Sequence, residues 1–269
     1  MIIWTINEER RDEMKFVFDL DGTICFHGKP VSENLLTSIE DLKAKGHEVI
    51  FASARPIRDL LPILHERFHH YPMVGGNGSM VAANGKIIST ICFSEETLAA
   101  TGRLLEAFNI TYLIDSEWDY AYTGPTDHPI LNNLDPLKRA KNVELHKLSS
   151  IIKILILTSD DRKEVLKRLS KMKVVVHIHG DEGIFDISPE GIDKWSGLQQ
   201  LGVKEREYIA FGNDSNDRTM FQHAGHTVMI GDNQQLKPFA SEQLFIEQDI
   251  ERKIINRLDK LASPHMLQI

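Results

Sequence analysis

Short apolar runs alternate with amphipathic stretches at both ends of this 269-residue chain. Near the start, Phe16-Val17-Phe18 is typical of a buried strand. A helical pattern then opens at Ser32 and stops near Gly46, and a second apolar run follows at residues 48–52. Two strands that are joined through a helix pair in parallel, with a right-handed crossover. The start of the chain therefore predicts a βαβ unit.

The C-terminal third repeats this order of elements. It predicts helices at residues 194–201 and 215–223 and from about residue 251, with strands at residues 208–211 and 227–230. Before the middle of the chain, a helix beginning near Pro56 and kinked at Pro62 leads to a short strand, residues 72–74, and a glycine-rich turn. Both ends together predict one α/β domain with a doubly wound, mostly parallel sheet and a Rossmann-like core.

The middle of the chain has a different pattern. It predicts helices at residues 94–108 and 160–170, and strands at residues 110–114, 151–157, 174–179 and 184–187. We interpret this stretch as an inserted α+β cap domain with its own sheet. The expected organisation is a core domain of residues 1–82 and 188–269 and a cap domain of residues 83–187.

Composition narrows the possible partners and the compartment. The 31 basic and 39 acidic side chains give a net charge of −8, and without a long basic run neither nucleic acid nor a membrane is an expected partner. The two cysteines, Cys25 and Cys92, have no spacing typical of a metal site or a disulfide framework, which favours a reducing compartment. The apolar start is too short for a signal peptide, and no stretch is long enough to span a bilayer. We expect a cytoplasmic protein.

Two carboxylates follow the first strand directly, at Asp19 and Asp21, and Gly22-Thr23 comes next. Ligands of open parallel sheets bind beyond the carboxyl ends of the strands, where both side chains would lie. One carboxylate can attack phosphorus, and a second carboxyl can protonate the leaving oxygen and then activate water. The alternative interpretation is an Asp-rich loop that only stabilises the following turn.

Four motifs resemble those of the haloacid dehalogenase-like hydrolases. Asp19-Leu20-Asp21-Gly22-Thr23 is similar to their DxDGT signature, and Ser53-Ala54-Arg55-Pro56 to their Ser/Thr motif at the end of the second strand. Lys194 resembles the family lysine, and residues 212–217 resemble the acidic metal loop. More than a hundred residues separate the second and third motifs, as in the Cof-type, sugar-phosphatase-like subfamily, whose class IIB cap is inserted there.

The resemblance implies a role for each matching residue. Phosphoryl transfer needs a hard cation, a lysine and short donors around the nucleophile. The implied catalytic residues are Asp19, Asp21 and Lys194. The implied phosphate-binding or substrate-binding residues are Ser53, Ala54, Arg55, Asn77, Gly78 and Asn216. The implied Mg²⁺ ligands are Asp19, Asp21 through its backbone carbonyl, Asn213 and Asp217.

Some positions leave two interpretations open. The family usually has an aspartate where this chain has Asn213, so we expect weaker Mg²⁺ binding or a larger share for Asp214 or Asp217. Trp195, where glycine is common, either narrows the pocket or packs outward. Asn77 is either a turn residue or a substrate contact.

Three weaker candidates lie outside the four motifs. His65, His69 and His70 have no acidic or cysteine partner at metal-site spacing, so we interpret them as a solvated helix end. We assign His177 and His179 to the surface of a sheet. Residues 115–122 combine aromatic and polar side chains and form either a sugar-binding surface or a polar hairpin.

Taken together, the sequence predicts an Mg²⁺-dependent phosphatase that hydrolyses small phosphorylated metabolites, such as sugar phosphates, through an aspartyl-phosphate on Asp19. A mutase that passes the phosphoryl group to a second hydroxyl would need the same residues. A non-catalytic sensor of a sugar phosphate is the alternative that Asn213 raises.

Overall fold

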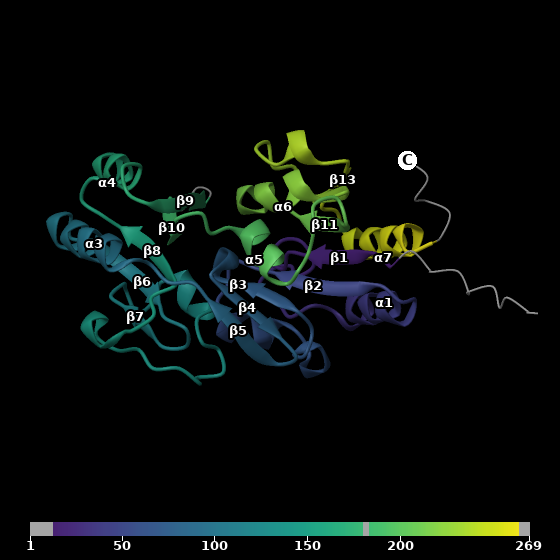
Figure 1. Cartoon of the computed structure of the whole chain (residues 1–269), viewed down its shortest axis with the longest axis horizontal. Coiled ribbons are helices and arrows are strands. Elements are labelled where there is room, and N and C mark those ends of the chain that lie inside the picture. Colours follow the sequence, from purple (N-terminus) through teal and green to yellow (C-terminus); the bar gives the residue numbers. More distant parts are fainter. Residues whose placement is uncertain (1–12, 180–182, 264–269) are drawn as a thin grey trace, which may run out of the picture.

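The chain folds around two sheets that lie side by side (Figure 1). The computed structural model describes residues 13–179 and 183–263, so the predicted absence of a signal peptide concerns residues outside the described ones. Helices α3 and α4 lie at the far side of the smaller sheet, and α1 and α7 lie together beside the larger one. In the described part of the chain, no helix is long and apolar enough to cross a membrane.

The larger sheet has eight strands in the order β13-β12-β11-β1-β2-β3-β4-β5. The strands from β13 to β3 are parallel, and the β4–β5 hairpin is antiparallel. Strand β1 therefore lies in the middle, between β2 and β11. The bounds are Lys15–Phe18 (β1), Glu48–Ala52 (β2), Met73–Gly75 (β3), Met80–Ala83 (β4), Lys86–Thr90 (β5), Tyr208–Gly212 (β11), His226–Ile230 (β12) and Glu242–Leu244 (β13).

Helices cover both faces of this sheet because alternate residues of a strand point to opposite sides. Phe16 and Phe18 of β1 pack with helices α1 and α7 on one face, and Val17 packs with α5 and α6 on the other. The predicted doubly wound α/β core is therefore confirmed. The helices are Glu33–Ala44 (α1), Ile57–Leu60 (α2), Lys194–Gln200 (α5), Arg218–His223 (α6) and Ile250–Leu261 (α7).

The hairpin β4–β5 crosses the predicted domain boundary at residues 82 and 83. Strand β5 pairs with β4 and so extends the larger sheet, although the sequence assigned residues 86–90 to the cap. The smaller sheet likewise includes β10, which runs to Pro189. We propose that the inserted cap begins after Thr90 and ends at Pro189.

The smaller sheet has five strands in the order β7-β6-β8-β10-β9, and its pairs are antiparallel. Helices α3 and α4 cover one face, where Ile154 and Ile156 of β8 pack. The other face carries Leu155 and Leu157 and is turned away from these helices. The bounds are Thr111–Asp115 (β6), Tyr120–Tyr122 (β7), Lys153–Thr158 (β8), Val174–His179 (β9), Ile184–Pro189 (β10), Glu95–Ala107 (α3) and Arg162–Leu169 (α4).

The predicted helix at Pro56 is shorter than expected. It ends as α2 at Leu60, and a 3-10 turn, Leu61–Ile63, follows because Pro62 has no backbone N–H to continue an α-helix. The predicted helix at residues 215–223 likewise begins with a 3-10 turn, Ser215–Asp217, before α6.

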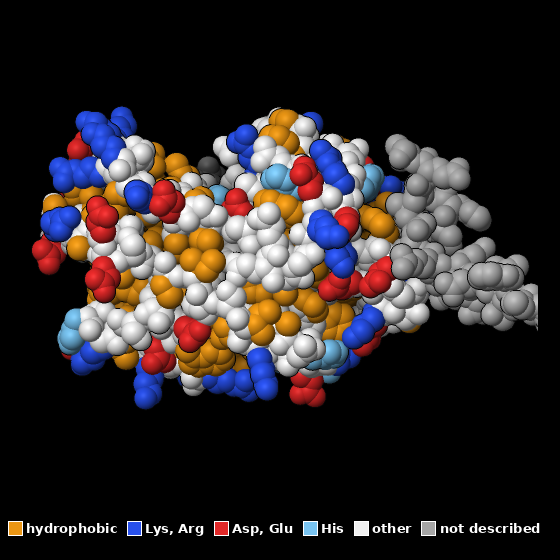
Figure 2. Space-filling view, viewed as in Figure 1, with side chains coloured by type: hydrophobic (Ala, Val, Ile, Leu, Met, Phe, Trp, Pro, Cys, Tyr) orange, Lys and Arg blue, Asp and Glu red, His pale blue; other side chains and the backbone are white. Residues whose placement is uncertain are grey.

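Charged side chains of both signs are mixed on the face shown in Figure 2. Lys and Arg lie mainly toward its edges with Asp and Glu between them, while the middle is mostly apolar or uncharged. This face therefore carries no continuous patch of one sign over both domains.

Candidate active site

Asp19 follows β1 directly and lies at the carboxyl end of the larger sheet. Its backbone N–H donates to the carbonyl of Phe211 on β11, which continues the ladder by one residue and fixes the backbone there (2.9 Å). The side chain is 6% exposed, and Thr23 donates its hydroxyl to Oδ2 (2.7 Å). Because the next turn begins at Leu20, Asp19 is the first residue free to point past the sheet.

Lys194 joins two buried carboxylates. Its Nζ lies 2.6 Å from Oδ1 of Asp19 and 2.6 Å from Oδ1 of Asp217, and its side chain is fully buried. Asp193 caps the start of α5 and forms a capping box with Ser196, which places Lys194 at the first helical position. The predicted residues Asp19, Lys194 and Asp217, which are separated by up to 198 positions, thus form one ionic cluster.

Burial controls the charge of this cluster. It raises the pKa of Asp19 to about 7, an effect that Lys194 opposes and Asp217 reinforces. Burial by itself would lower the pKa of Lys194, but the two carboxylates outweigh it and raise this pKa. Since the cluster has two carboxylates for one lysine, a further positive charge beside Asp19 would favour its ionised form.

Asp217 organises the loop that follows β11. Its Oδ2 accepts the backbone N–H groups of Asn213 (2.8 Å) and Asp214 (3.1 Å), while its Oδ1 accepts from Lys194. Both oxygens are therefore engaged within the protein. This geometry favours a structural role for Asp217 over the predicted role of Mg²⁺ ligand.

The oxygens around Thr23 fit a magnesium ion. The Thr23 hydroxyl lies 2.7 Å from Oδ2 of Asp19 and 3.3 Å from Oδ1 of Asn213, so both oxygens approach the same point. Gly22 has φ +77°, and a Cβ there would lie 2.1 Å from Nδ2 of Asn213, so only glycine lets the loops approach so closely. No cluster of three or more His, Cys, Asp or Glu side chains among the described residues could hold a metal. Mg²⁺ also accepts carbonyl and amide oxygens and water, so the mixed donor set is suitable.

Asp21 is held by Arg55 across the site. The guanidinium donates from Nε to Oδ2 and from Nη2 to Oδ1, both at 2.7 Å. The Asp21 side chain is 44% exposed, whereas Asp19 is buried, so the two aspartates have the different environments that separate roles require. Ser53 is buried after β2, and its Oγ accepts the backbone N–H of Arg55 (3.1 Å).

Asn77 lies in a turn and also faces the cap. It has φ 56°, and its backbone N–H donates to the carbonyl of Ser53 (3.1 Å), as the turn interpretation requires. Its amide also donates to Asp186 of the cap (3.0 Å) and accepts from Asn216 (3.1 Å). Gly78 has φ +111°, and a Cβ there would lie 2.0 Å from the carbonyl oxygen before α5. These residues connect the core to the cap beside the site.

The cap supplies two buried charges that the sequence analysis did not assign to the site. Lys153 Nζ lies 2.9 Å from Oδ2 of Asp186 and 2.6 Å from the carbonyl oxygen of Ala54. Arg58 and Asp59, two further buried charges, lie on α2 in the core. The signal in the sequence is a charged residue inside an apolar strand, Lys153 among residues 151–157 and Asp186 among residues 184–187.

The remaining candidates lie away from this site. Trp195 stacks on Tyr208 and His223 and packs against the core. Its ring therefore points away from the reaction site, as the second interpretation requires. The Nε2 of His69 lies within hydrogen-bonding distance of the carbonyl oxygens of Leu61 and Leu64, so this ring stabilises the turn after α2.

The structure also places two other histidines and the aromatic segment. His65 caps the 3-10 turn Glu66–Phe68. His177 lies on β9, at the edge of the smaller sheet, and lines a pocket between the cap and the core together with Asn216. Residues 115–122 form the hairpin between β6 and β7, and Asp115 is buried there.

Comparisons with known proteins identify the family of this chain. A family model described as haloacid dehalogenase-like hydrolase matches residues 16–244. The chain is 25% identical over 232 residues to the 5-amino-6-(5-phospho-D-ribitylamino)uracil phosphatase YitU of Bacillus subtilis, covering 79% of this chain and 84% of that protein. The crystal structure of SMU.1108c from Streptococcus mutans gives a TM-score of 0.77 at 18% identity and covers 93% of this chain and 100% of that one. The HAD subclass IIB sugar phosphatase BT4131 gives a TM-score of 0.72 at 18% identity, covering 93% and 99%.

The family match spans most of the chain, including all four motifs, and the solved structures share the fold over more than nine-tenths of it. The predicted family, its Cof-type branch and the predicted fold class are therefore confirmed. The predicted enzyme class, a phosphoric monoester hydrolase, agrees with the family and with the names of its relatives. The chain belongs to the haloacid dehalogenase-like hydrolase family.

Proposed function

We propose that this protein is an Mg²⁺-dependent phosphatase of small phosphorylated metabolites and that Asp19 is its nucleophile. The observation that carries the proposal is the buried Asp19 carboxylate, which is held by Lys194 and Thr23 at the end of the central strand. Asp21 lies two residues away in a more exposed position. This combination suits a nucleophile and a separate acid–base group.

The proposed reaction has two displacements at phosphorus. In the first, an Asp19 oxygen bonds to phosphorus, the bond to the leaving oxygen breaks, and Asp21 gives its proton to that oxygen. In the second, Asp21 takes a proton from water, whose oxygen bonds to phosphorus and displaces Asp19. Lys194 and the Ser53 hydroxyl hold the phosphoryl oxygens, since charge on these oxygens is what the site has to stabilise.

One Mg²⁺ would be held by Asp19, the backbone carbonyl of Asp21 and Asn213, and it would supply positive charge at the transferring phosphoryl group. Asn213 offers an amide oxygen in place of a carboxylate, so this chain has less negative charge for the cation. We expect Asn213→Asp to lower the Mg²⁺ concentration for half-maximal activity about tenfold. An unchanged or higher concentration would show that Asn213 is not a ligand.

The direct test is turnover of acetyl phosphate and p-nitrophenyl phosphate with and without Mg²⁺. We expect release of inorganic phosphate by the wild type and at least a 1,000-fold lower kcat for Asp19→Asn, because the amide cannot form the intermediate. Acid quenching with ³²P-labelled substrate should leave label on the wild-type protein only. A mutase would release little phosphate, and a sensor would bind phosphoesters without turnover, so either result would refute the proposal.

The relatives support the substrate class in general terms. YitU is named for a phosphorylated ribitylaminouracil, and BT4131 is named a sugar phosphatase. Both names describe phosphoesters of small molecules. We propose the same general class for this chain.

A further inference from the structure

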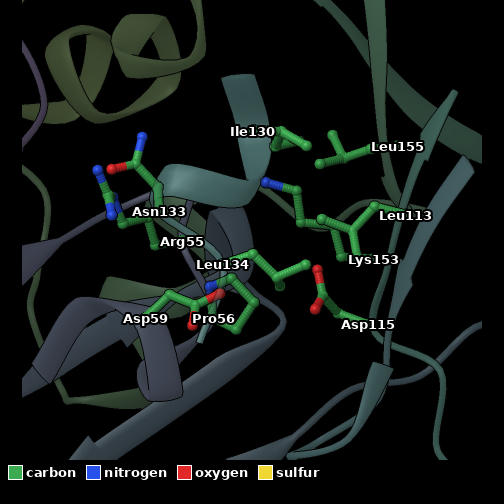
Figure 3. A pocket seen from close by; sticks show the side chains of 10 residues that line it. All are labelled: Arg55, Pro56, Asp59, Leu113, Asp115, Ile130, Asn133, Leu134, Lys153 and Leu155. Carbon is green, nitrogen blue, oxygen red and sulfur yellow. The ribbon is translucent and has the colours of Figure 1, made fainter. Parts of the chain in front are cut away.

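A pocket lies between the core and the face of the smaller sheet that is turned away from α3 and α4. Figure 3 shows side chains from both domains around one common space. Arg55, Pro56 and Asp59 come from the core at the start of α2. The cap contributes residues of β6 and β8 and of the segment after β7.

One end of this pocket reaches the proposed reaction site. Arg55 lines the pocket and holds Asp21 through two hydrogen bonds of 2.7 Å. Lys153 lines it too and contacts the carbonyl oxygen of Ala54, next to Ser53 (2.6 Å). A phosphomonoester bound at Asp19 would therefore extend its leaving group past Asp21 into this space.

The wall opposite the core is aliphatic. Leu113 and Leu155 project from neighbouring strands of the smaller sheet, and Ile130 and Leu134 close the side. Leu113, Leu134 and Leu155 belong to the buried cluster on the face of the sheet that is turned away from α3 and α4. Aliphatic side chains offer no hydrogen bonds, and each hydroxyl placed against them without a partner costs free energy. A polyhydroxylated sugar is poorly matched to such a wall.

The charged side chains at the pocket already have partners. Arg55 is paired with Asp21, Arg58 with Asp59 and Asp115, and Lys153 with Asp186. When Asp21 carries the proton that it gives to the leaving oxygen, these three cations face three carboxylates, so the surroundings have no net charge. A second phosphate or a carboxylate on the leaving group would add negative charge where no excess cation balances it.

We infer that this pocket holds the leaving group of the substrate and that this group is an uncharged planar heterocycle. Such a ring has two apolar faces that can lie against the leucines and only a few polar atoms at its edge. The side chains of Asn133 and Asp115 also line the pocket and offer hydrogen-bonding groups for that edge. The inference rests on the proposed function, because the position of the phosphoryl group orients the substrate.

The test compares leaving groups of similar size on the wild-type enzyme with Mg²⁺. Pyridoxine 5′-phosphate carries a planar ring, ribose 5-phosphate carries a polyhydroxylated leaving group, and acetyl phosphate has a leaving group too small to fill the pocket. We expect kcat/KM for pyridoxine 5′-phosphate to exceed that for ribose 5-phosphate at least tenfold, the effect of a few apolar contacts. Equal values, or a preference for the sugar, would overturn the inference while leaving the phosphatase proposal intact.

Two variants localise the effect. Leu155 and Leu157 lie on the same face of β8 in the same buried cluster, but only Leu155 lines the pocket. We expect Leu155→Thr to lower kcat/KM for pyridoxine 5′-phosphate about tenfold more than it lowers kcat/KM for acetyl phosphate. Leu157→Thr, the matched control, should change neither by more than about twofold. Equal losses in both variants would contradict the inference.

Binding of the alcohols pyridoxine and ribose provides a readout that needs no turnover. Calorimetry on the wild type should detect pyridoxine and should show weaker binding to Leu155→Thr, with ribose at least tenfold weaker than pyridoxine. If no phosphoester is hydrolysed, the phosphatase proposal fails and this measurement alone decides the question of the pocket. Pyridoxine binding no tighter than ribose binding would then overturn the inference.

Discussion

Arg58 offers the sharpest test of how the two domains are held together. It lies on α2 of the core with 1% of its side chain exposed, and it donates to Asp59 (2.6 Å) and to Asp115 of the cap (2.8 Å). Its Nη1 also donates to the carbonyl oxygen of Trp118 in the cap (2.6 Å). Arg58→Met would keep much of the side-chain volume and remove the charge between two buried carboxylates.

The loss in the free energy of unfolding depends on whether the unpaired carboxylates stay charged or become protonated. Breaking a buried ion pair by removing one member costs about 3–5 kcal/mol. Protonation limits the cost, because neutralising an aspartate with an ordinary pKa near 3.9 at pH 7 takes about 4 kcal/mol. Burial already raises the pKa of Asp115, and Arg58 opposes this shift. We therefore expect Arg58→Met to lower the free energy of unfolding by about 3–4 kcal/mol at pH 7.

The sign of the pH dependence is fixed by the same argument. Without Arg58 the folded-state pKa of Asp115 rises further above the unfolded value, so the folded variant binds more protons than the folded wild type. The loss in the free energy of unfolding, called the deficit below, therefore grows as pH rises. At pH 5.5 neutralising the carboxyl takes only about 2 kcal/mol, so the deficit should shrink by up to about 2 kcal/mol. Urea unfolding at both pH values measures this difference.

Two further variants complete the test. Arg252→Met removes an exposed guanidinium that pairs with Asp249, and it should leave stability almost unchanged. The double variant Arg58→Met/Asp115→Asn should be more stable than Arg58→Met at pH 7, because its buried carboxylate has become an uncharged amide. A deficit below about 1 kcal/mol at pH 7, or one that does not depend on pH, would refute the reasoning.

Three other measurements test further parts of the structure. Gly78→Ala should destabilise the protein by at least about 2 kcal/mol more than Gly46→Ala; both glycines have positive φ, but only at Gly78 would the new Cβ meet a backbone oxygen, at 2.0 Å. Burial would raise the pKa of Glu242, but hydrogen bonds from His226 and Arg257 keep it below its usual value. The stability that these bonds provide is present above about pH 4.5 and lost as pH falls, so Glu242→Gln should flatten acid unfolding; an unchanged acid slope would contradict this. Saturating Mg²⁺ should raise the melting temperature in a concentration-dependent way, and EDTA should reverse it; no shift would argue against a magnesium site.

Much of the core could be predicted from periodicity. Apolar runs at residues 16–18 and 48–52 form β1 and β2, and the carboxylates that follow β1 lie beyond the sheet because the strand ends there. Strand β5 was assigned to the cap because a short strand has the same local pattern whichever sheet it joins.

In the candidate site, too, the sequence predicted some features and not others. The predicted residues Asp19 and Lys194 do meet. Asn77 forms the turn of one interpretation and also contacts the cap, and its role as a substrate contact stays a prediction. The predicted ligand Asp217 instead uses its oxygens on Lys194 and on two backbone amides, which no spacing rule reveals.

The sequence by itself determined the residue types of the reaction site, their order and the strand ends that carry them, because strand and helix periodicity and turn chemistry are local properties of the chain. Only the tertiary structure decided what lies opposite them. The Asn77–Asp186 and Arg58–Asp115 contacts and the aliphatic pocket wall each join segments far apart in sequence. Their geometry depends on how one sheet docks on the other, a packing of whole surfaces that no local pattern encodes.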